Sequence, residues 1–117
     1  MIILYDTITG ETLKLAKRFN IPSKRISNYE DDSKQIILIS RRLFVSEDKA
    51  KLKNFLIKNN KNIIGVVLYD NKLFGTEYGS SLAVYSKYNI PILRVWDKIV
   101  SDEEIRELEE ELISHVE

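Results

Sequence analysis

The sequence predicts a single α/β domain built on a doubly wound, five-stranded parallel sheet with helices on both faces. Short β-branched runs alternate with helical patterns along the chain, as in strand–helix–strand units. Two runs, residues 36–39 and 63–69, are apolar at nearly every position, as expected of central strands buried on both faces. The length, 117 residues, fits one domain with room for five strands.

The amino-terminal half is expected to hold strands at residues 2–5, 23–26 and 36–39. The first helix should run from about residue 10 to residue 19, and Pro22 follows its end because proline cannot continue the helical hydrogen-bond ladder. Residues 27–34 are polar and are expected to form a loop. Ser46 then begins a helix that ends in the turn at residues 59–62, and its inner face indicates core packing.

The carboxyl-terminal half is expected to hold strands at residues 63–69 and 90–95, with a helix from about residue 78 to residue 88 between them. A capping box, Ser101-x-x-Glu104, precedes a last helix with one narrow apolar stripe, and the acidic outer face of this helix is expected to be solvated. Joined by right-handed connections, these elements give the flavodoxin-like strand order 2-1-3-4-5.

Composition excludes several kinds of chemistry. The chain has no cysteine and one histidine, His115, close to its end, so thiolate nucleophiles, disulfides, iron–sulfur ligation and a Ser-His-Asp arrangement are excluded. No apolar run approaches the roughly 20 residues that span a bilayer, and no secretion signal is recognisable. We therefore expect a cytoplasmic protein, with no metal site, whose redox chemistry, if any, belongs to a bound cofactor.

Charge is unevenly distributed although the net charge is zero. Residues 101–117 carry a net charge of −7, so residues 1–100 carry +7. A basic body steers an anionic ligand or an acidic protein partner towards it. The lysines are scattered, with no arginine-rich or aromatic-interleaved stripe, which argues against nucleic acid.

The segment Thr7-Ile8-Thr9-Gly10-Glu11-Thr12 lies between the first strand and the first helix. Its hydroxyl groups and free backbone N–H groups would gather at a helix amino terminus, where an anion is favoured. Gly10 has no Cβ, so the backbone can fold tightly there. The segment lacks the lysine of a Walker A loop and the three glycines of a dinucleotide fingerprint. It predicts a phosphate cradle; the alternative is that Thr9 simply caps the helix.

In an open α/β sheet, ligands bind beyond the carboxyl ends of the strands where strand order reverses. Here the loops at that point are residues 6–12, 41–46 and 70–78. The second loop offers arginines and Phe44, and the third offers amide and aromatic groups. Such loops suit a flat, phosphorylated ligand, although Phe74 and Tyr78 could instead pack the third loop onto the sheet.

These residues resemble a known family. Residues 5–12 resemble the flavodoxin phosphate loop, Ser/Thr-x-Thr-Gly-x-Thr. Residues 65–93, with Asp70-Asn71-Lys72-Leu73-Phe74-Gly75 and later Ile90-Pro91-Ile92-Leu93, are similar to the NrdI family, which runs strand, Gly-Asn-x-x-Trp/Phe-Gly, helix, Val-Pro-x-Leu. The resemblance spans nearly the whole chain.

The resemblance implies an FMN-binding redox accessory protein rather than a substrate-turnover enzyme. Its reduced flavin would react with dioxygen and supply oxidant for the dimanganese-tyrosyl radical cofactor of class Ib ribonucleotide reductase. The implied partners are the small radical-generating subunit of that reductase and an electron donor such as a flavodoxin reductase, with no nucleic acid and no membrane. The cofactor-binding residues so implied are Thr7, Ile8, Thr9, Gly10, Glu11, Thr12, Arg42, Leu43, Phe44, Asp70, Asn71, Phe74, Gly75 and Tyr78.

The chain departs from the family pattern once in the phosphate loop and several times in the segments next to the flavin ring. Glu11 stands where the family has asparagine, and Asp70 where it has glycine; residues 42–46 and 97–101 also lack the family's glycines. An alternative is therefore a divergent, flavin-free binding module that acts on the reductase small subunit. A phospho-receiver domain shares the strand order but needs an aspartate at the end of the third strand, where this chain has Ser40 and then arginine.

Overall fold

The computed structural model describes residues 1–5, 10–30, 34–40, 46–69, 79–96 and 99–116, and their side chains except those of residues 11, 46–51, 79–82 and 115–116. The elements, in chain order, are β1 (Ile2–Tyr5), α1 (Glu11–Lys17), β2 (Ser23–Arg25), the 3-10 turn η1 (Ile26–Asn28), β3 (Ile36–Ser40), α2 (Ser46–Asn59), the 3-10 turn η2 (Asn60–Asn62), β4 (Ile63–Tyr69), α3 (Gly79–Lys87), β5 (Ile92–Trp96) and α4 (Asp102–Val116).

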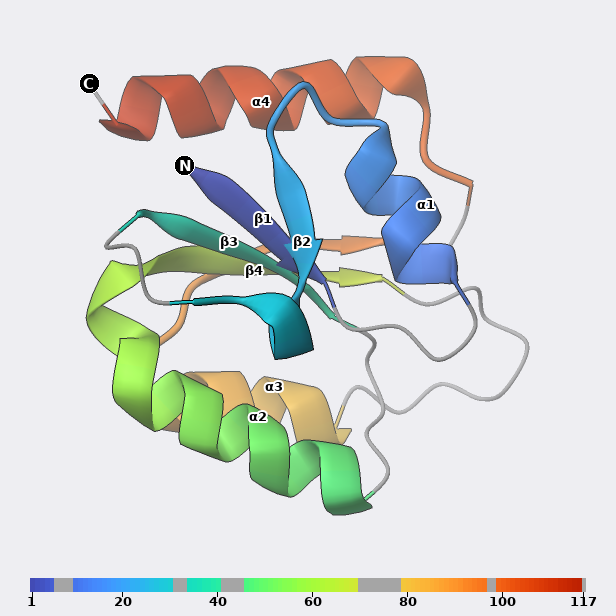
Figure 1. Cartoon of the computed structure of the whole chain (residues 1–117). Helices are drawn as coiled ribbons and strands as arrows, with labels where there is room; N and C mark the ends of the chain where they lie inside the picture. Colours follow the sequence, from blue (N-terminus) through green and yellow to red (C-terminus); the bar gives the residue numbers. More distant parts are fainter. Residues whose placement is uncertain (6–9, 31–33, 41–45, 70–78, 97–98, 117) are drawn as a thin grey trace.

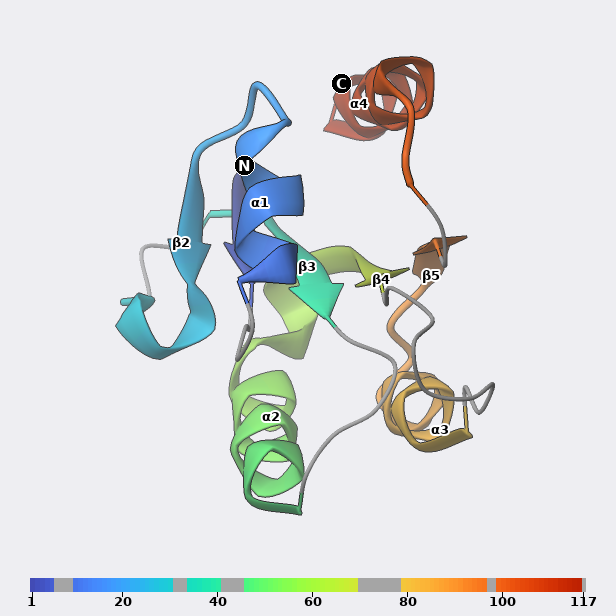
Figure 2. The same ribbon diagram turned by 90° about the vertical axis from the view of Figure 1, so that its right-hand side faces the viewer.

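The five strands form one parallel sheet in the order β2-β1-β3-β4-β5, which confirms the predicted topology. Helices α1 and α4 cover one face, and α2 and α3 cover the other (Figures 1 and 2). The central strands end nearly level, because Tyr5 pairs with Ile39 and Ser40 pairs with Leu68. The carboxyl ends of β1, β3 and β4 therefore lie at one edge of the sheet.

Alternation along the strands divides the core into two clusters. In β1, Ile3 packs with α1 and α4, whereas Ile2 and Leu4 pack with α2 and α3. All five residues of β3 are buried, as predicted for a central strand. A strand buried on both faces needs apolar residues at successive positions, which is why the β3 and β4 sequences read as nearly continuous apolar runs.

Gly65 interrupts the apolar run of β4 for a packing reason. A Cβ atom at this position would lie 2.5 Å from Cγ of Leu93 on the neighbouring strand β5. That separation is far below a normal carbon–carbon contact, so a larger residue would force Leu93 or the strand to move. Glycine here lets the Leu93 side chain lie over β4 on the α1/α4 side of the sheet.

The crossover from β2 to β3 differs from the prediction. β2 ends at Arg25 rather than residue 26, and the segment expected to be a loop begins with the turn η1. The cause is packing, because Ile26 and Tyr29 lie against the α2/α3 cluster, and Tyr29 meets the ring of Phe55 edge-on with the centroids 6.0 Å apart. The turn is three residues long, and Ile26 is its half-buried member.

Strand β5 begins at Ile92, two residues later than predicted. Pro91 has no N–H to donate to a strand ladder, so the regular strand starts after it. Its carbonyl still accepts a hydrogen bond from the Val66 N–H at 2.9 Å, which leads the chain into the sheet. Ile90, just before the proline, is buried in the α2/α3 cluster.

The capping box of α4 forms as predicted. The Glu104 N–H donates to Oγ of Ser101 at 3.1 Å, and the Ser101 N–H donates to Oε2 of Glu104 at 3.3 Å. The predicted apolar stripe is confirmed at Ile105, Leu108 and Leu112, which are at most 2% exposed; its fourth member, Val116, has a side chain outside those described. Among the described residues no helix combines the length and the apolar character needed to cross a membrane.

Helix α4 is fastened to the carboxyl end of α1 by polar contacts. Arg18 Nη2 donates to Asp102 Oδ1 at 2.8 Å, and Arg106 Nη2 donates to the Arg18 carbonyl at 3.0 Å. Glu109 accepts from the Asn20 N–H at 3.3 Å and from Arg106. Glu109 is only 8% exposed, so the expectation of a fully solvated acidic surface was wrong at this position. The reason is that its carboxylate satisfies a backbone N–H just beyond α1.

The Arg18–Asp102 pair predicts a pH-dependent contribution to stability. The hydrogen bond from Arg18, and then its charge, hold the pKa of Asp102 below its usual 3.8. A lowered native pKa stabilises the fold above the unfolded-state pKa, and this stabilisation disappears as the pH falls through the native value. We therefore expect Asp102→Asn to lower the Tm at neutral pH and to have no effect at a pH well below 3.8. Thermal unfolding followed by circular dichroism at a series of pH values measures this difference.

The matched control is Glu103→Gln, which removes a charge from the same first turn of α4 but from a residue that makes no ion pair with Arg18 in the described structure. Both changes weaken the interaction with the helix dipole. The ion pair therefore accounts only for the amount by which Asp102→Asn lowers the Tm more than Glu103→Gln does. Equal Tm changes for the two variants at every pH would show that Arg18 contributes nothing.

Candidate functional site

The candidate site lies where strand order reverses. β1 is flanked by β2 on one side and β3 on the other. β1 is followed in the chain by α1 on one face of the sheet, and β3 is followed by α2 on the other face, so the helices after these two neighbouring strands diverge (Figure 2). Such divergence leaves room for a ligand beyond the carboxyl ends of the strands.

Gly10 is the described residue that ends the first loop. It occupies the N-cap position of α1 with φ 89° and ψ −2°, a left-handed conformation. Its carbonyl accepts the first helical hydrogen bond, from the Lys14 N–H at 3.0 Å. The interpretation of Thr9 as the N-cap is therefore wrong. The chain needs a residue at Gly10 that tolerates positive φ, which is the local property expected of a tight turn around a ligand.

Thr12 lies one residue inside α1 and is fully buried. A hydroxyl at this depth must satisfy its hydrogen-bonding groups within the protein or with a bound group. Glu11 is the first residue of α1, and its side chain is not among those described. Gly10, Glu11 and Thr12 thus form a continuous described segment that carries the first loop into the helix.

The other two predicted loops follow the last residues of β3 and β4 in the chain. Ser40, the last residue of β3, is 1% exposed, and Tyr69, the last residue of β4, is half-buried. Because the strands are in parallel register, Tyr5, Ser40 and Tyr69 end their strands at the same edge of the sheet. The structure therefore brings together the starting points of the three loops that the sequence identified.

Most of the predicted cofactor-binding residues lie outside the described residues. They are Thr7, Ile8, Thr9, Arg42, Leu43, Phe44, Asp70, Asn71, Phe74, Gly75 and Tyr78. What the structure describes of the candidate site is its framework: the ends of β1, β3 and β4 and the segment from Gly10 to Thr12.

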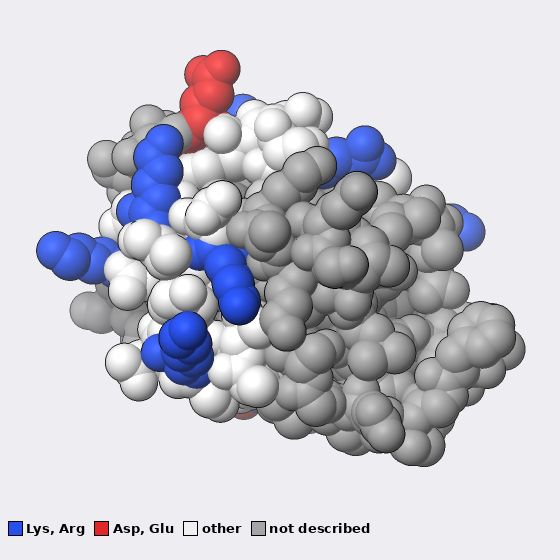
Figure 3. All heavy atoms as spheres, turned by 90° about the horizontal axis from the view of Figure 1, so that it is seen from below, with Lys and Arg blue, Asp and Glu red and all other residues white. Residues whose placement is uncertain are grey.

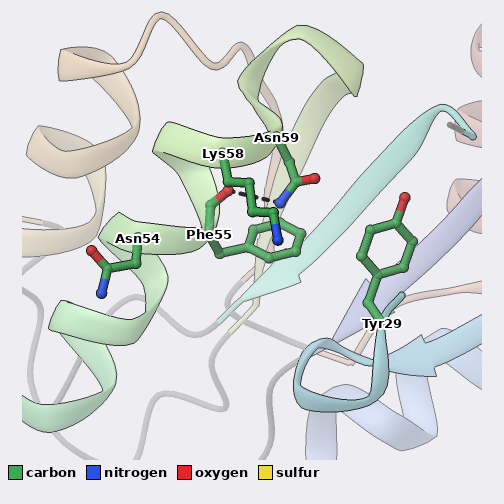
Figure 4. Close-up of a pocket in the computed structure, with 5 residues that line it drawn as sticks. All are labelled: Tyr29, Asn54, Phe55, Lys58 and Asn59. Carbon is green, nitrogen blue, oxygen red and sulfur yellow. Dashed lines mark hydrogen bonds between the residues drawn. The ribbon is translucent and has the colours of Figure 1, made fainter. Parts of the chain in front are cut away.

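A hollow that the sequence did not predict lies between η1 and the second half of α2 (Figure 4). Its volume is about 210 Å³, and its lining includes Tyr29, Asn54, Phe55 and Lys58. Asn59 is also part of the lining; it is 5% exposed and donates from Nδ2 to the Phe55 carbonyl at 3.0 Å. No local pattern could reveal this hollow, because it depends on contact between Tyr29 and a helix 26 residues away. Since α2 returns the chain to the amino end of β4, the hollow is separate from the carboxyl edge.

No protein-family model and no curated protein matched this chain in sequence comparisons.

Proposed function

We propose that the chain is an FMN-binding, flavodoxin-like redox protein that supports class Ib ribonucleotide reductase. The observation that carries this proposal is the position of Gly10: a left-handed glycine directly after a threonine-rich loop, at the point where strand order reverses. A phosphate group needs several donors in a tight turn, and this segment combines such a turn with the hydroxyls of Thr7, Thr9 and Thr12.

The conformation of Gly10 supports the proposal that the phosphate end of such a cofactor binds here. The Gly10 backbone adopts a tight turn, and no heavy atom of the described chain lies within 4 Å of where its Cβ would be. In the proposed arrangement the first loop binds the phosphate, while Phe44, Phe74 and Tyr78 orient the flavin ring and exclude water from one side of it. When bound, the flavin supplies the electron transfer to dioxygen that produces the oxidant; the protein supplies binding and position.

The charge of the chain also supports an anionic cofactor. Residues 1–100 carry a net charge of +7, and a positive surface raises the rate at which anions arrive. We further propose that the protein works in the cytoplasm, that a flavodoxin reductase or a similar protein reduces it, and that its oxidant is delivered to the small radical-generating subunit of the reductase.

The first test of this proposal is flavin retention. Protein incubated with excess FMN and then desalted is expected to keep about one flavin per chain, measured by visible absorbance. Riboflavin, which lacks the phosphate, is the matched control ligand and is expected to bind at least about tenfold more weakly, because each charge-assisted hydrogen bond contributes about 1.5–3 kcal/mol. A protein that retains no FMN overturns the proposal, and equal affinity for the two ligands overturns the phosphate-loop assignment.

A second candidate function is favoured by the missing glycines at residues 42–46, at Asp70 and at residues 97–101. In this case the domain binds the reductase small subunit without carrying flavin. Co-purification distinguishes the two functions: a colourless complex with the small subunit supports the binding module. Formation of the tyrosyl radical, measured by electron paramagnetic resonance only when FMN, a reductant and dioxygen are all present, supports the flavoprotein.

A further inference from the structure

Charged side chains are unevenly distributed over the described helices. Helix α4 carries seven acidic residues and one arginine within Asp102–Val116. On the opposite layer, lysine and arginine side chains gather over the described part of the surface (Figure 3). The zero net charge of the chain therefore conceals two surfaces of opposite sign.

We define the basic face as Lys53, Ile57, Lys58 and Lys61, which lie on the second half of α2 and on η2. Residues four apart lie on one side of an α-helix, so Ile57 lies beside Lys53 on α2. Lys58 follows Ile57 in the chain, and Lys61 lies on η2, just beyond the end of α2. Ile57 is 61% exposed. Within the described part of the chain, these three lysines make no ion pair. The face thus combines an exposed apolar residue with lysines that make no ion pair with another described residue.

We define the acidic face as Glu103, Glu107, Glu110, Ile113 and Ser114 of α4. Glu107, Glu110 and Ser114 line a shallow, open hollow of about 480 Å³ together with Glu111. Ile113, which is 58% exposed, lies one turn beyond Glu110. Glu111 is already paired with Arg94 at 2.6 Å, whereas Glu103, Glu107 and Glu110 make no ion pair with any described residue. This face is also an exposed isoleucine beside uncompensated charge, but the charge is negative.

We propose that the occupant of each face is the other face of a second copy of this chain, so that the copies associate head to tail. The two faces carry charges of opposite sign, and each adds an isoleucine that would be removed from water. They lie on opposite sides of the sheet (Figures 1 and 2). One molecule can therefore use both faces at once, and with zero net charge no long-range repulsion opposes the approach of a second copy.

The geometry predicts the form of the assembly. A contact between two different surfaces is heterologous. It adds copy after copy into an open chain of molecules, unless the rotation that relates one copy to the next closes the assembly into a ring. The contact is expected to be weak and sensitive to salt, because exposed charges contribute mainly to association rate and specificity. It leaves the carboxyl edge of the sheet uncovered, so it does not depend on the proposed flavin site.

Sedimentation velocity of the purified protein tests the association directly. At about 10 mM salt, where charges act over about 30 Å, the average sedimentation coefficient is expected to rise with protein concentration beyond the value of a dimer. At about 1 M salt, where the range is about 3 Å, it is expected to return to the monomer value. A protein that is monomeric at every concentration in low salt overturns the proposal.

Charge reversal tests which faces meet. The variants Glu107→Lys/Glu110→Lys and Lys58→Glu/Lys61→Glu each remove one face and are expected to be monomeric alone. In an equal mixture, the intact basic face of the first variant can bind the intact acidic face of the second. The two reversed faces, one now basic and the other now acidic, also complement each other. The mixture is therefore expected to associate again, whereas a mixture that stays monomeric overturns the pairing of these two faces.

The matched control is Lys14→Glu/Lys17→Glu, which makes the same charge change at two exposed residues of α1, outside both faces. It is expected to associate as the unmodified protein does. Dissociation of this control to the same extent would show that net charge alone governs association, which overturns the proposed contact. FMN retention, measured in parallel, is expected to be unchanged in all three variants.

Discussion

Replacing Leu108 with alanine is expected to lower the free energy of unfolding by about 2–5 kcal/mol. Leu108 is 0% exposed and lies in the cluster that joins α1 and α4 to the sheet. Truncation removes buried methyl groups and leaves a cavity that the rigid sheet cannot fill. Among the side chains described in α4, Ile105, Leu108 and Leu112 are the buried apolar residues that pack on the core. Loss of the Leu108 side chain, the central one, therefore weakens the packing of the whole helix on the sheet.

Urea unfolding measures this change, with the midpoint and the slope both recorded. Ile113→Ala is the matched control, since it shortens an aliphatic residue of the same helix at a position that is 58% exposed. This control is expected to change stability by no more than about 0.5 kcal/mol. A small effect of Leu108→Ala, equal to that of the control, would mean that α4 does not pack on the sheet as described.

The sheet and its helices were predictable because each element has a local signal. The runs at residues 36–39 and 63–69 are apolar on both faces, and only central parallel strands require that. The Ser101–Glu104 capping box marks the start of α4 within one residue, because its two hydrogen bonds depend only on residues three apart. Strand order then followed from right-handed connections.

Features that depend on distant contacts were not predictable. Ile26 leaves the strand ladder and packs against the α2/α3 cluster, whose residues come from elements far apart in the chain. Glu109 is buried because it meets the Asn20 N–H, 89 residues away in the chain. The need for glycine at residue 65 comes from Leu93 on the next strand. In each case the residue that determines the structure is too distant in the sequence to be found from the local pattern of apolar and polar residues.

The framework of the candidate site was likewise predictable, since the carboxyl ends of β1, β3 and β4 had to lie at one edge once strand order was known. The left-handed conformation at Gly10 was not assigned in advance. A glycine permits positive φ but does not require it. Only the structure therefore distinguishes a glycine needed for its backbone conformation from a glycine needed because a side chain would not fit.

Gly10→Val is expected to lower FMN affinity by a factor on the order of 10–100. At φ 89° a β-branched residue is strained by about 1–3 kcal/mol, and each 1.4 kcal/mol corresponds to tenfold in affinity. The variant would favour a different backbone conformation between β1 and α1, and the first loop would lose the shape proposed to hold the phosphate. Fluorescence titration of FMN, at a temperature where circular dichroism shows the variant folded, measures the affinity.

Gly10→Asn separates backbone strain from steric obstruction. Asparagine adopts the left-handed region at low cost, and no heavy atom of the described chain lies within 4 Å of an added Cβ at this position. Its affinity for FMN is therefore expected to stay within about threefold of the unmodified protein. If both variants lost affinity equally, the side chain itself would obstruct the ligand; if folded Gly10→Val bound FMN normally, the phosphate would be held somewhere other than this turn.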